Sequence, residues 1–117
     1  MFRTLKQANK AMGKYLISAS YTPEGTKGLL KEGGSGRAAQ IENIMTSLGG
    51  KMEAFYYAFG KDDVYVIVEV PNPESAMALS LATNATGMVK IRITPLLETK
   101  EVDEACKISI KYRGPGQ

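Results

Sequence analysis

Asp62 and Asp63 are two adjacent carboxylates between Gly60 and an apolar run that begins at Val64. Two carboxylates that share a proton can act as a general acid and a general base, provided that both side chains converge on one point. Adjacent residues of a strand point to opposite faces of a sheet, so convergence is not expected here. The simpler interpretation gives Asp62 a turn hydrogen bond and makes Asp63 the polar start of the strand.

A sharper interpretation assigns chemistry to Asp63 alone. Asp63 and Tyr65 are two residues apart, so both point to the same face of the predicted strand. If Arg92 of the last strand lies nearby, Asp63 becomes a candidate general base or orienting group. Asp63 and Tyr65 are therefore the candidate catalytic residues.

Basic and hydroxyl side chains on two other predicted strands are candidates for ligand binding. Lys90 and Arg92 alternate along the last strand, and Ser18 and Ser20 alternate along the first. On a solvated edge, such basic residues protect a sheet against aggregation. In a cavity between subunits they would bind a carboxylate or phosphate, with Tyr65 and the two serines as hydrogen-bond partners. Both interpretations remain open.

The glycine-rich stretch "EGGSGRAAQ" is a further candidate for anion binding. Its glycines allow backbone N–H groups to converge, Ser35 can open a helix, and Arg37 lies close by. The stretch lacks the ending of a phosphate-binding P-loop. A plain helix break is favoured, with Arg37 kept as a candidate ligand contact and the loop as a candidate lid.

The chain contains no histidine and a single cysteine, Cys106. Serine or cysteine nucleophiles activated by histidine, histidine-bound zinc and a proximal haem histidine are all excluded. One cysteine cannot form an intrachain disulfide, which fits a reducing compartment. Cys106 is expected to fill a core or an interface. The sequence predicts no cofactor and no metal site.

The charge and the hydropathy of the chain limit the classes of partner that we expect it to bind. The 117 residues carry a formal net charge of only +3, and the basic residues are dispersed instead of forming a stripe. Nucleic-acid binding is therefore not expected. No stretch resembles the apolar region of a signal peptide or reaches membrane-spanning length. We expect a cytoplasmic protein without membrane contact.

Alternation, capping residues and glycines predict the order strand, helix, strand, strand, helix, strand. Thr22 and Asn72 are predicted caps with proline following each, and Ser35 and Thr99 are predicted caps of two further helical pieces. This β-α-β-β-α-β order is typical of a ferredoxin-like α+β fold, an antiparallel sheet with its main helices on one face. The expected division is a flexible extension over 1–13, the ferredoxin-like domain over 14–98, and a C-terminal helix and tail over 99–117.

The two faces of the predicted sheet differ in composition. Val64, Val66, Val68 and Val70 form one apolar face suited to lie beneath the helices, while Tyr65 and Ile67 point to the open face. The second strand allows two phases: either Phe55, Tyr57 and Phe59 or Met52, Ala54, Tyr56 and Ala58 face the helices. An open face with apolar and aromatic groups is best covered by a second subunit, so we expect a homo-oligomer, a dimer through this face.

At this point the chain resembles the GYD domain family, small ferredoxin-like proteins related in shape to dimeric α-β barrels. The resemblance covers about Lys14 to Glu98 and is carried by "KYLISASYT", "SLGGKMEAFYYAFGKDDVYVIVEVPN" and "VKIRITPLL". The Gly-x-Tyr-Asp stretch that gives the family its name corresponds to 60–63, where Asp62 replaces the tyrosine. The resemblance implies the fold; the family's biochemical role is unassigned.

Three functions remain open. The first is an oligomeric module that binds a small anionic or aromatic metabolite, or regulates through it. The second is a cofactor-independent oxygenase or isomerase of the dimeric α-β barrel type, with Asp63 or a tyrosine as base. The third is a structural partner subunit. The helix predicted after Thr99 and the "YRGPGQ" tail would dock on another protein.

Overall fold

The computed structural model describes residues 12–117. Its elements are β1 (Gly13–Tyr21), α2 (Pro23–Glu32), α3 (Gly34–Ser47), β2 (Lys51–Tyr57), β3 (Val64–Val70), α4 (Pro73–Ala85), β4 (Val89–Leu96) and α5 (Thr99–Cys106). Of the predicted N-terminal extension, 1–11 lie outside the described residues, and Gly13 already belongs to β1.

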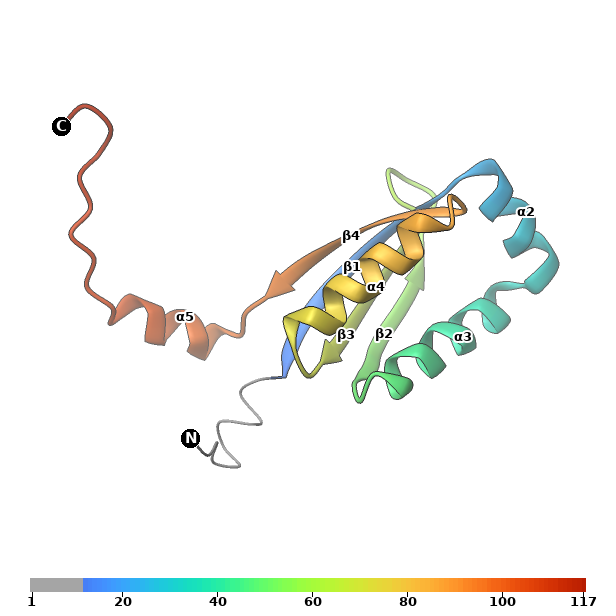
Figure 1. Cartoon of the computed structure of the whole chain (residues 1–117), viewed down its shortest axis with the longest axis horizontal. Helices are drawn as coiled ribbons and strands as arrows, with labels where there is room; N and C mark the ends of the chain where they lie inside the picture. Colours follow the sequence, from blue (N-terminus) through green and yellow to red (C-terminus); the bar gives the residue numbers. More distant parts are fainter. Residues whose placement is uncertain (1–11) are drawn as a thin grey trace.

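The four strands form one antiparallel sheet in the order β2-β3-β1-β4. Helices α2, α3 and α4 lie over one face of this sheet, while α5 continues beyond its end (Figure 1). This arrangement is the ferredoxin-like fold, as the element order predicted.

The helix starts follow the capping chemistry in two cases and depart from it in two. The side chains of Thr22 and Asn72 accept N–H bonds from Gly25 and Ser75, with proline at the next position in each case, as predicted. Ser35 is not a cap. The chain turns at Gly33 instead, whose φ of 84° favours glycine, so α3 begins one residue before Ser35.

The cap of α5 also lies one residue before the predicted one. Glu98, not Thr99, caps this helix, because its side chain accepts from the backbone of Glu101 while the Glu101 side chain accepts from the backbone of Glu98. Such a reciprocal pair satisfies two N–H groups at once. A lone threonine hydroxyl satisfies one.

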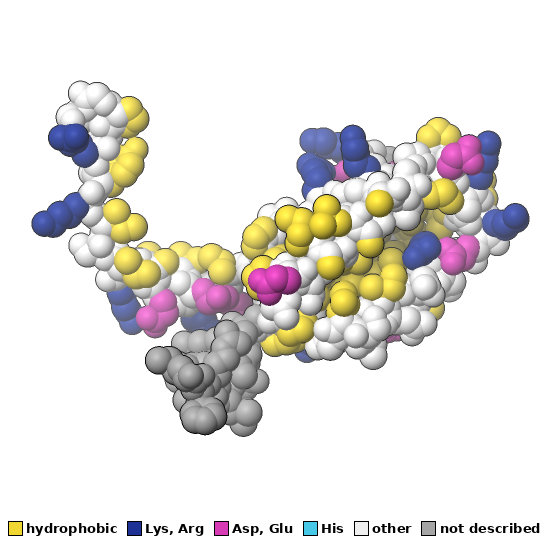
Figure 2. Space-filling model, in the orientation of Figure 1, with side chains coloured by type: hydrophobic (Ala, Val, Ile, Leu, Met, Phe, Trp, Pro, Cys, Tyr) yellow, Lys and Arg dark blue, Asp and Glu magenta, His cyan; other side chains and the backbone are white. Residues whose placement is uncertain are grey.

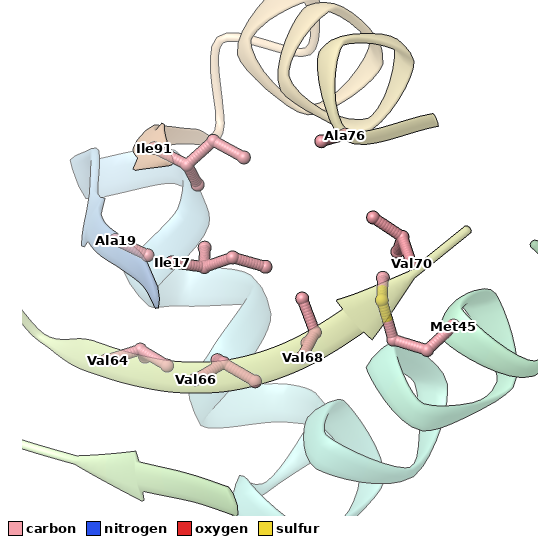
Figure 3. Packing of buried hydrophobic residues seen from close by; sticks show 9 residues of the cluster. All are labelled: Ile17, Ala19, Met45, Val64, Val66, Val68, Val70, Ala76 and Ile91. Atoms are coloured by element: carbon pink, nitrogen blue, oxygen red, sulfur yellow. The ribbon is translucent and has the colours of Figure 1, made fainter. Parts of the chain in front are cut away.

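The core lies between the sheet and the helices. All four alternating valines of β3 are at most 3% exposed, and Ile17, Ala19 and Ile91 of the neighbouring strands are buried beside them. Met45 from α3 and Ala76 from α4 complete the cluster (Figure 3). The predicted inward face of β3 is thus confirmed.

Each predicted phase of β2 is correct over only part of the strand, because the strand contains a bulge. The register with β3 shifts between Met52 and Ala54. An extra residue lets side chains on both sides of it point the same way, so Met52 and Phe55 both pack on the core. Ala54 and Tyr56 pair with Ile67 and Tyr65 on the open face.

The C-terminal part extends away from the body of the molecule (Figure 1). Helix α5 is exposed throughout, and Cys106, which was expected to fill a core or an interface, is exposed at its last position. Beyond it Ile108, Ile110 and Tyr112 are 68%, 76% and 77% exposed. Within the described residues, no helix is both long and apolar enough to span a bilayer.

Candidate functional site

Asp62 is the centre of a polar cluster on the open face of the sheet. It lies in the connection between β2 and β3, yet is only 7% exposed. Its carboxylate accepts hydrogen bonds from Ser20 Oγ at 3.0 Å, Tyr65 Oη at 3.3 Å and Arg92 Nη2 at 2.8 Å. We call Ser20, Asp62, Tyr65 and Arg92 the Asp62 cluster.

Asp63 lies elsewhere and makes different contacts. Its carboxylate accepts the backbone N–H of Tyr21 at 2.8 Å, and its own N–H donates to the carbonyl of Ala19 at 2.8 Å. Its carbonyl accepts from Ala58 N at 2.7 Å. The expected positions of the two aspartates are therefore exchanged: Asp62 lies beside Tyr65 and Arg92, and Asp63 ties the connection to the end of β1.

This exchange follows from the length of the connection. β2 ends at Tyr57 and β3 begins at Val64, so residues 58–63 form a loop that is longer than a tight hairpin turn. A longer loop leaves its residues free of strand alternation. Asp62 can then fold over the open face, where three donors satisfy it.

The Asp62 cluster has the chemistry of a structural lock. Loss of hydration, and next the charge of Asp62 and its hydrogen bond, raise the pKa of Tyr65, so the phenol stays a donor at neutral pH. Arg92 neutralises the carboxylate, although the Arg92 side chain is 60% exposed. All three contacts are hydrogen bonds that strand residues donate to Asp62. They hold the β2–β3 loop against the open face of the sheet.

The other predicted binding residues are divided between the two faces. Ser18 is 8% exposed and pairs across the strands with Tyr65 and Arg92, next to the Asp62 cluster. Lys90 pairs with Ser20 and is exposed. Arg37 belongs to α3 and lies on the opposite, helix-covered face.

Replacing Asp62 with alanine is expected to lower the free energy of unfolding by about 1–3 kcal/mol, because three hydrogen bonds are lost and Ser20 loses its partner. The exposed Arg92 contributes little of this. Urea denaturation measures the change. Asp103→Ala, at an exposed site on α5, is the control and should stay within about 0.5 kcal/mol of the wild type. Equal effects of the two substitutions would contradict the lock.

A cleft of about 880 Å³ opens on the helix side of the sheet, bounded by α2, α3 and α4. Figure 2 shows its hydrophobic floor recessed between the helices. The floor comes from β1, β3 and β4, and the walls from apolar residues of the helices. The apolar lining includes Ile17, Ala19, Val64, Val66, Ile91, Leu29, Ile41, Ile44, Leu79 and Ala82.

Polar groups of the cleft include Tyr21, Thr83 and Thr86, and the charged residues of the α2–α3 junction. Arg37 Nη1 lies 3.5 Å from Glu32 Oε1 across that junction, and both residues line the cleft. Nearby, Tyr57 Oη donates to the carbonyl of Gly34 at 2.9 Å. Glu32, Arg37 and Tyr57 are all close enough to Tyr21 to influence its ionisation.

Tyr21 is a hydrogen-bond donor at neutral pH. Burial, and next the neighbouring Tyr57, raise the pKa of Tyr21 to about 12, against a smaller lowering by Arg37. A phenol with this pKa keeps its proton over the physiological range, so it can donate to a ligand but cannot act as a base.

Sequence reasoning missed this cleft, although two signals pointed to it. Tyr21 shares the inward face of the first strand with Ile17 and Ala19, which puts a phenol beside the core. Small residues also line the helix surfaces that face the cleft, namely Gly25, Gly28, Ala78 and Ala82. Over residues 12–117, no group of three or more acidic, cysteine or histidine side chains is placed to hold a metal ion.

Comparison with known proteins gives one structure and one family. No curated protein matches significantly. A solved structure of a feast or famine regulatory protein from M. tuberculosis, complexed with L-methionine, aligns at 16% identity with a TM-score of 0.48. That alignment covers 97% of this chain and 64% of the other, so this chain spans less than two thirds of that protein. The family model of the GYD domain matches residues 15–106, and the chain therefore belongs to the GYD domain family.

Proposed function

We propose that this protein binds a small molecule with an apolar or aromatic body and an anionic group, in the cleft between the sheet and the helices. The cleft itself carries the proposal. Its volume of about 880 Å³ falls in the range of about 300–1,000 Å³ typical of small-molecule sites. An apolar lining with a few polar groups is the usual composition of such sites.

Arg37 and Tyr21 are the residues that would orient the ligand. The side chains of Arg37 and Glu32 are 31% and 40% exposed, and a half-exposed ion pair of this kind contributes little stability. A ligand carboxylate or sulfonate can therefore replace Glu32 at the guanidinium, which can donate two parallel hydrogen bonds to two oxygens of one anionic group. The protonated phenol of Tyr21 supplies a further donor.

The binding function is favoured over the oxygenase or isomerase alternative, because the candidate bases are protonated or already hydrogen-bonded. Catalysis of that kind needs a base in contact with the substrate. In the cleft, burial holds Tyr21 protonated, so its phenol cannot take a proton from a ligand. Asp63, the base expected from sequence, has its carboxylate bonded to the backbone of Tyr21.

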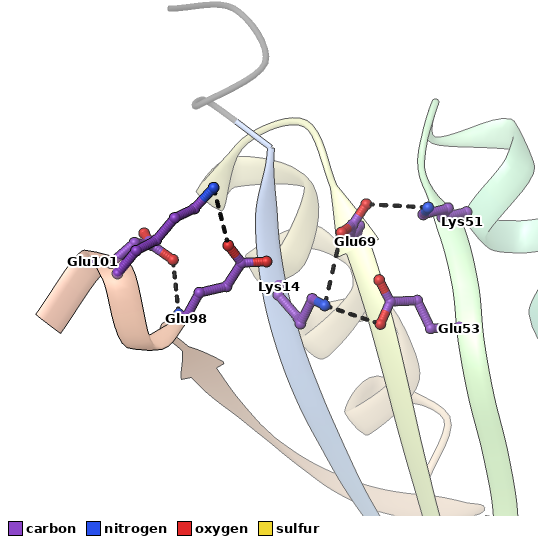
Figure 4. Close-up of polar contacts among 7 residues, drawn as sticks. Lys14, Lys51, Glu53, Glu69, Glu98 and Glu101 are labelled. Carbon is purple, nitrogen blue, oxygen red and sulfur yellow. Dashed lines mark hydrogen bonds and ion pairs between the residues drawn. The ribbon is translucent and has the colours of Figure 1, made fainter.

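A second copy of the chain on the open face remains part of the proposal. Charges on this face are paired within the chain: Lys14 Nζ lies 3.1 Å from Glu53, and Glu69 contacts both Lys14 and Lys51 (Figure 4). The Lys14–Glu53 hydrogen bond raises the pKa of Lys14 and lowers that of Glu53. Because these charges are paired within the chain, a second subunit can cover this face without burying an unpaired charge. Light scattering on the wild type checks for a dimer.

Filling the cleft is expected to abolish most ligand binding. The probe is anilinonaphthalene sulfonate, which combines aromatic rings with an anion. Ala82→Phe should weaken its binding at least about tenfold, because Ala82 lines the cleft. Ala39→Phe, on an exposed surface of α3, is the matched control and should leave the dissociation constant within about twofold.

Arg37→Gln tests how much the anionic group of the ligand contributes to binding, separately from its aromatic body. It should weaken the sulfonate probe by about threefold to tenfold, since one charge-assisted contact is lost, and leave a neutral naphthalene probe unaffected. Fluorescence titration measures both probes. Equal affinity of wild type and Ala82→Phe for the sulfonate would overturn the proposed site.

A further inference from the structure

We propose that residues 107–113, which we call the C-terminal arm, form a fifth strand that pairs with the β2 edge of a second copy of this chain. The arm reads Lys-Ile-Ser-Ile-Lys-Tyr-Arg, a strict alternation of polar and apolar residues. This period of two, with β-branched and aromatic residues at the apolar positions, is typical of a strand with one buried face. The arm is bounded by the end of α5 and by Gly114-Pro115, which cannot continue a strand.

Among residues 12–117, no strand pairs with the arm. Its apolar row, Ile108, Ile110 and Tyr112, is 68–77% exposed. The arm runs away from the sheet, with hydrophobic side chains open to solvent along its length (Figures 1 and 2). A strand is stabilised by its ladder and by burial of one face, so this sequence needs a sheet edge from elsewhere.

Of the two sheet edges, β4 is closed to an added strand. The Asn84 side chain accepts from the backbone N–H of Ile91 at 2.8 Å and donates to its carbonyl at 3.3 Å. Further along β4, Pro95 has no N–H to offer. A capped backbone and a proline are both known means of blocking an edge strand.

The β2 edge is the one that remains. In the described part of the chain, no side chain forms a hydrogen bond to the backbone of Lys51–Tyr57. β2 has seven residues, the same length as the arm. Addition of a strand at this edge uses main-chain hydrogen bonds for affinity, as in other cases of β-augmentation.

A second copy is the occupant because the donor arm and the acceptor edge lie far apart in one chain. The arm continues from β4, whereas β2 is the opposite edge strand, three strand spacings or about 14 Å away across the sheet. In a twofold pair, each copy's arm completes the other's sheet, and no arm or edge is left free. An unpaired arm and an unpaired edge would otherwise both favour aggregation.

The decisive experiment uses the single native cysteine. Cys106 is exposed and directly precedes the arm, so a nitroxide attached there reports where the arm lies. Nitroxide-labelled protein is mixed with ¹⁵N-labelled Cys106→Ser protein, so that only effects between copies are observed. We expect selective broadening of the amide resonances of 51–57. Broadening at the β4 edge or the cleft instead, or none at all, overturns the proposal.

Proline substitution tests the pairing itself. Alternate N–H groups of an added strand face its neighbour, so Ile110→Pro or Lys111→Pro should remove a ladder bond. We expect at least one of them to raise the dimer dissociation constant about tenfold or more in sedimentation equilibrium. Gln117→Pro, outside the arm, is the control and should leave it within about twofold. Unchanged dissociation constants for both arm variants would contradict arm exchange.

Discussion

Replacing Gly25 with alanine is expected to destabilise the fold by about 3 kcal/mol, at the upper end of what overpacking usually costs. A Cβ atom at Gly25 would overlap the backbone carbonyl of Met88. Thr22 fixes this approach, because its N–H donates to the Met88 carbonyl at 3.0 Å and its hydroxyl bonds the same segment. The overlap cannot be relieved by turning a side chain, so the start of α2 must move away from the connection that precedes β4.

Gly28→Ala is the matched control in the same helix. A Cβ at Gly28 would meet only the flexible end of the Met88 side chain, at 3.9 Å. Alanine is favoured over glycine in a helix interior, so we expect a gain of up to about 1 kcal/mol. Urea denaturation of both variants decides the matter. If Gly25→Ala were as stable as Gly28→Ala, the close contact between α2 and the Met88 backbone would be wrong.

Met45→Ala is expected to lower the free energy of unfolding by about 2–5 kcal/mol. Met45 is 0% exposed and packs against the valines of β3; Figure 3 shows it pointing toward Val70. Its backbone carbonyl also accepts N–H bonds from Leu48 and Gly50 at the end of α3. Truncation leaves a cavity where α3 meets the sheet, and α3 forms one wall of the cleft.

The exposed methionine Met77 provides the comparison. It is 59% exposed on α4, so Met77→Ala should change stability by no more than about 0.5 kcal/mol. Thermal and urea unfolding measure the stability of both methionine variants. Ligand binding should weaken in Met45→Ala only as far as the folded population falls. A loss of affinity in fully folded Met45→Ala would show that α3 has moved at the cleft.

The fold was predictable because its signals are local. The valines of β3 alternate without interruption, and Thr22 and Asn72 each precede a proline, so strand faces and two helix starts follow from neighbouring residues alone. The order of the elements then leaves the ferredoxin-like arrangement as the expected packing.

The candidate sites were less predictable because they depend on contacts between distant segments. Asp62 and Asp63 exchanged roles because the β2–β3 connection is longer than a tight turn, and its donors come from β1, β3 and β4. Similarly, the phase of β2 is set by a bulge that exists only in its pairing with β3.

The sequence by itself therefore determined the fold class, the buried face of β3 and the family, since these rest on periodicity and on residues close together in the chain. Tertiary structure alone decided which aspartate lies among Ser20, Tyr65 and Arg92. It also decided that Tyr21 and Arg37 line one apolar cleft. The physical reason is that a cleft is space left between elements, and that space depends on how α2, α3 and α4 are spread over the sheet.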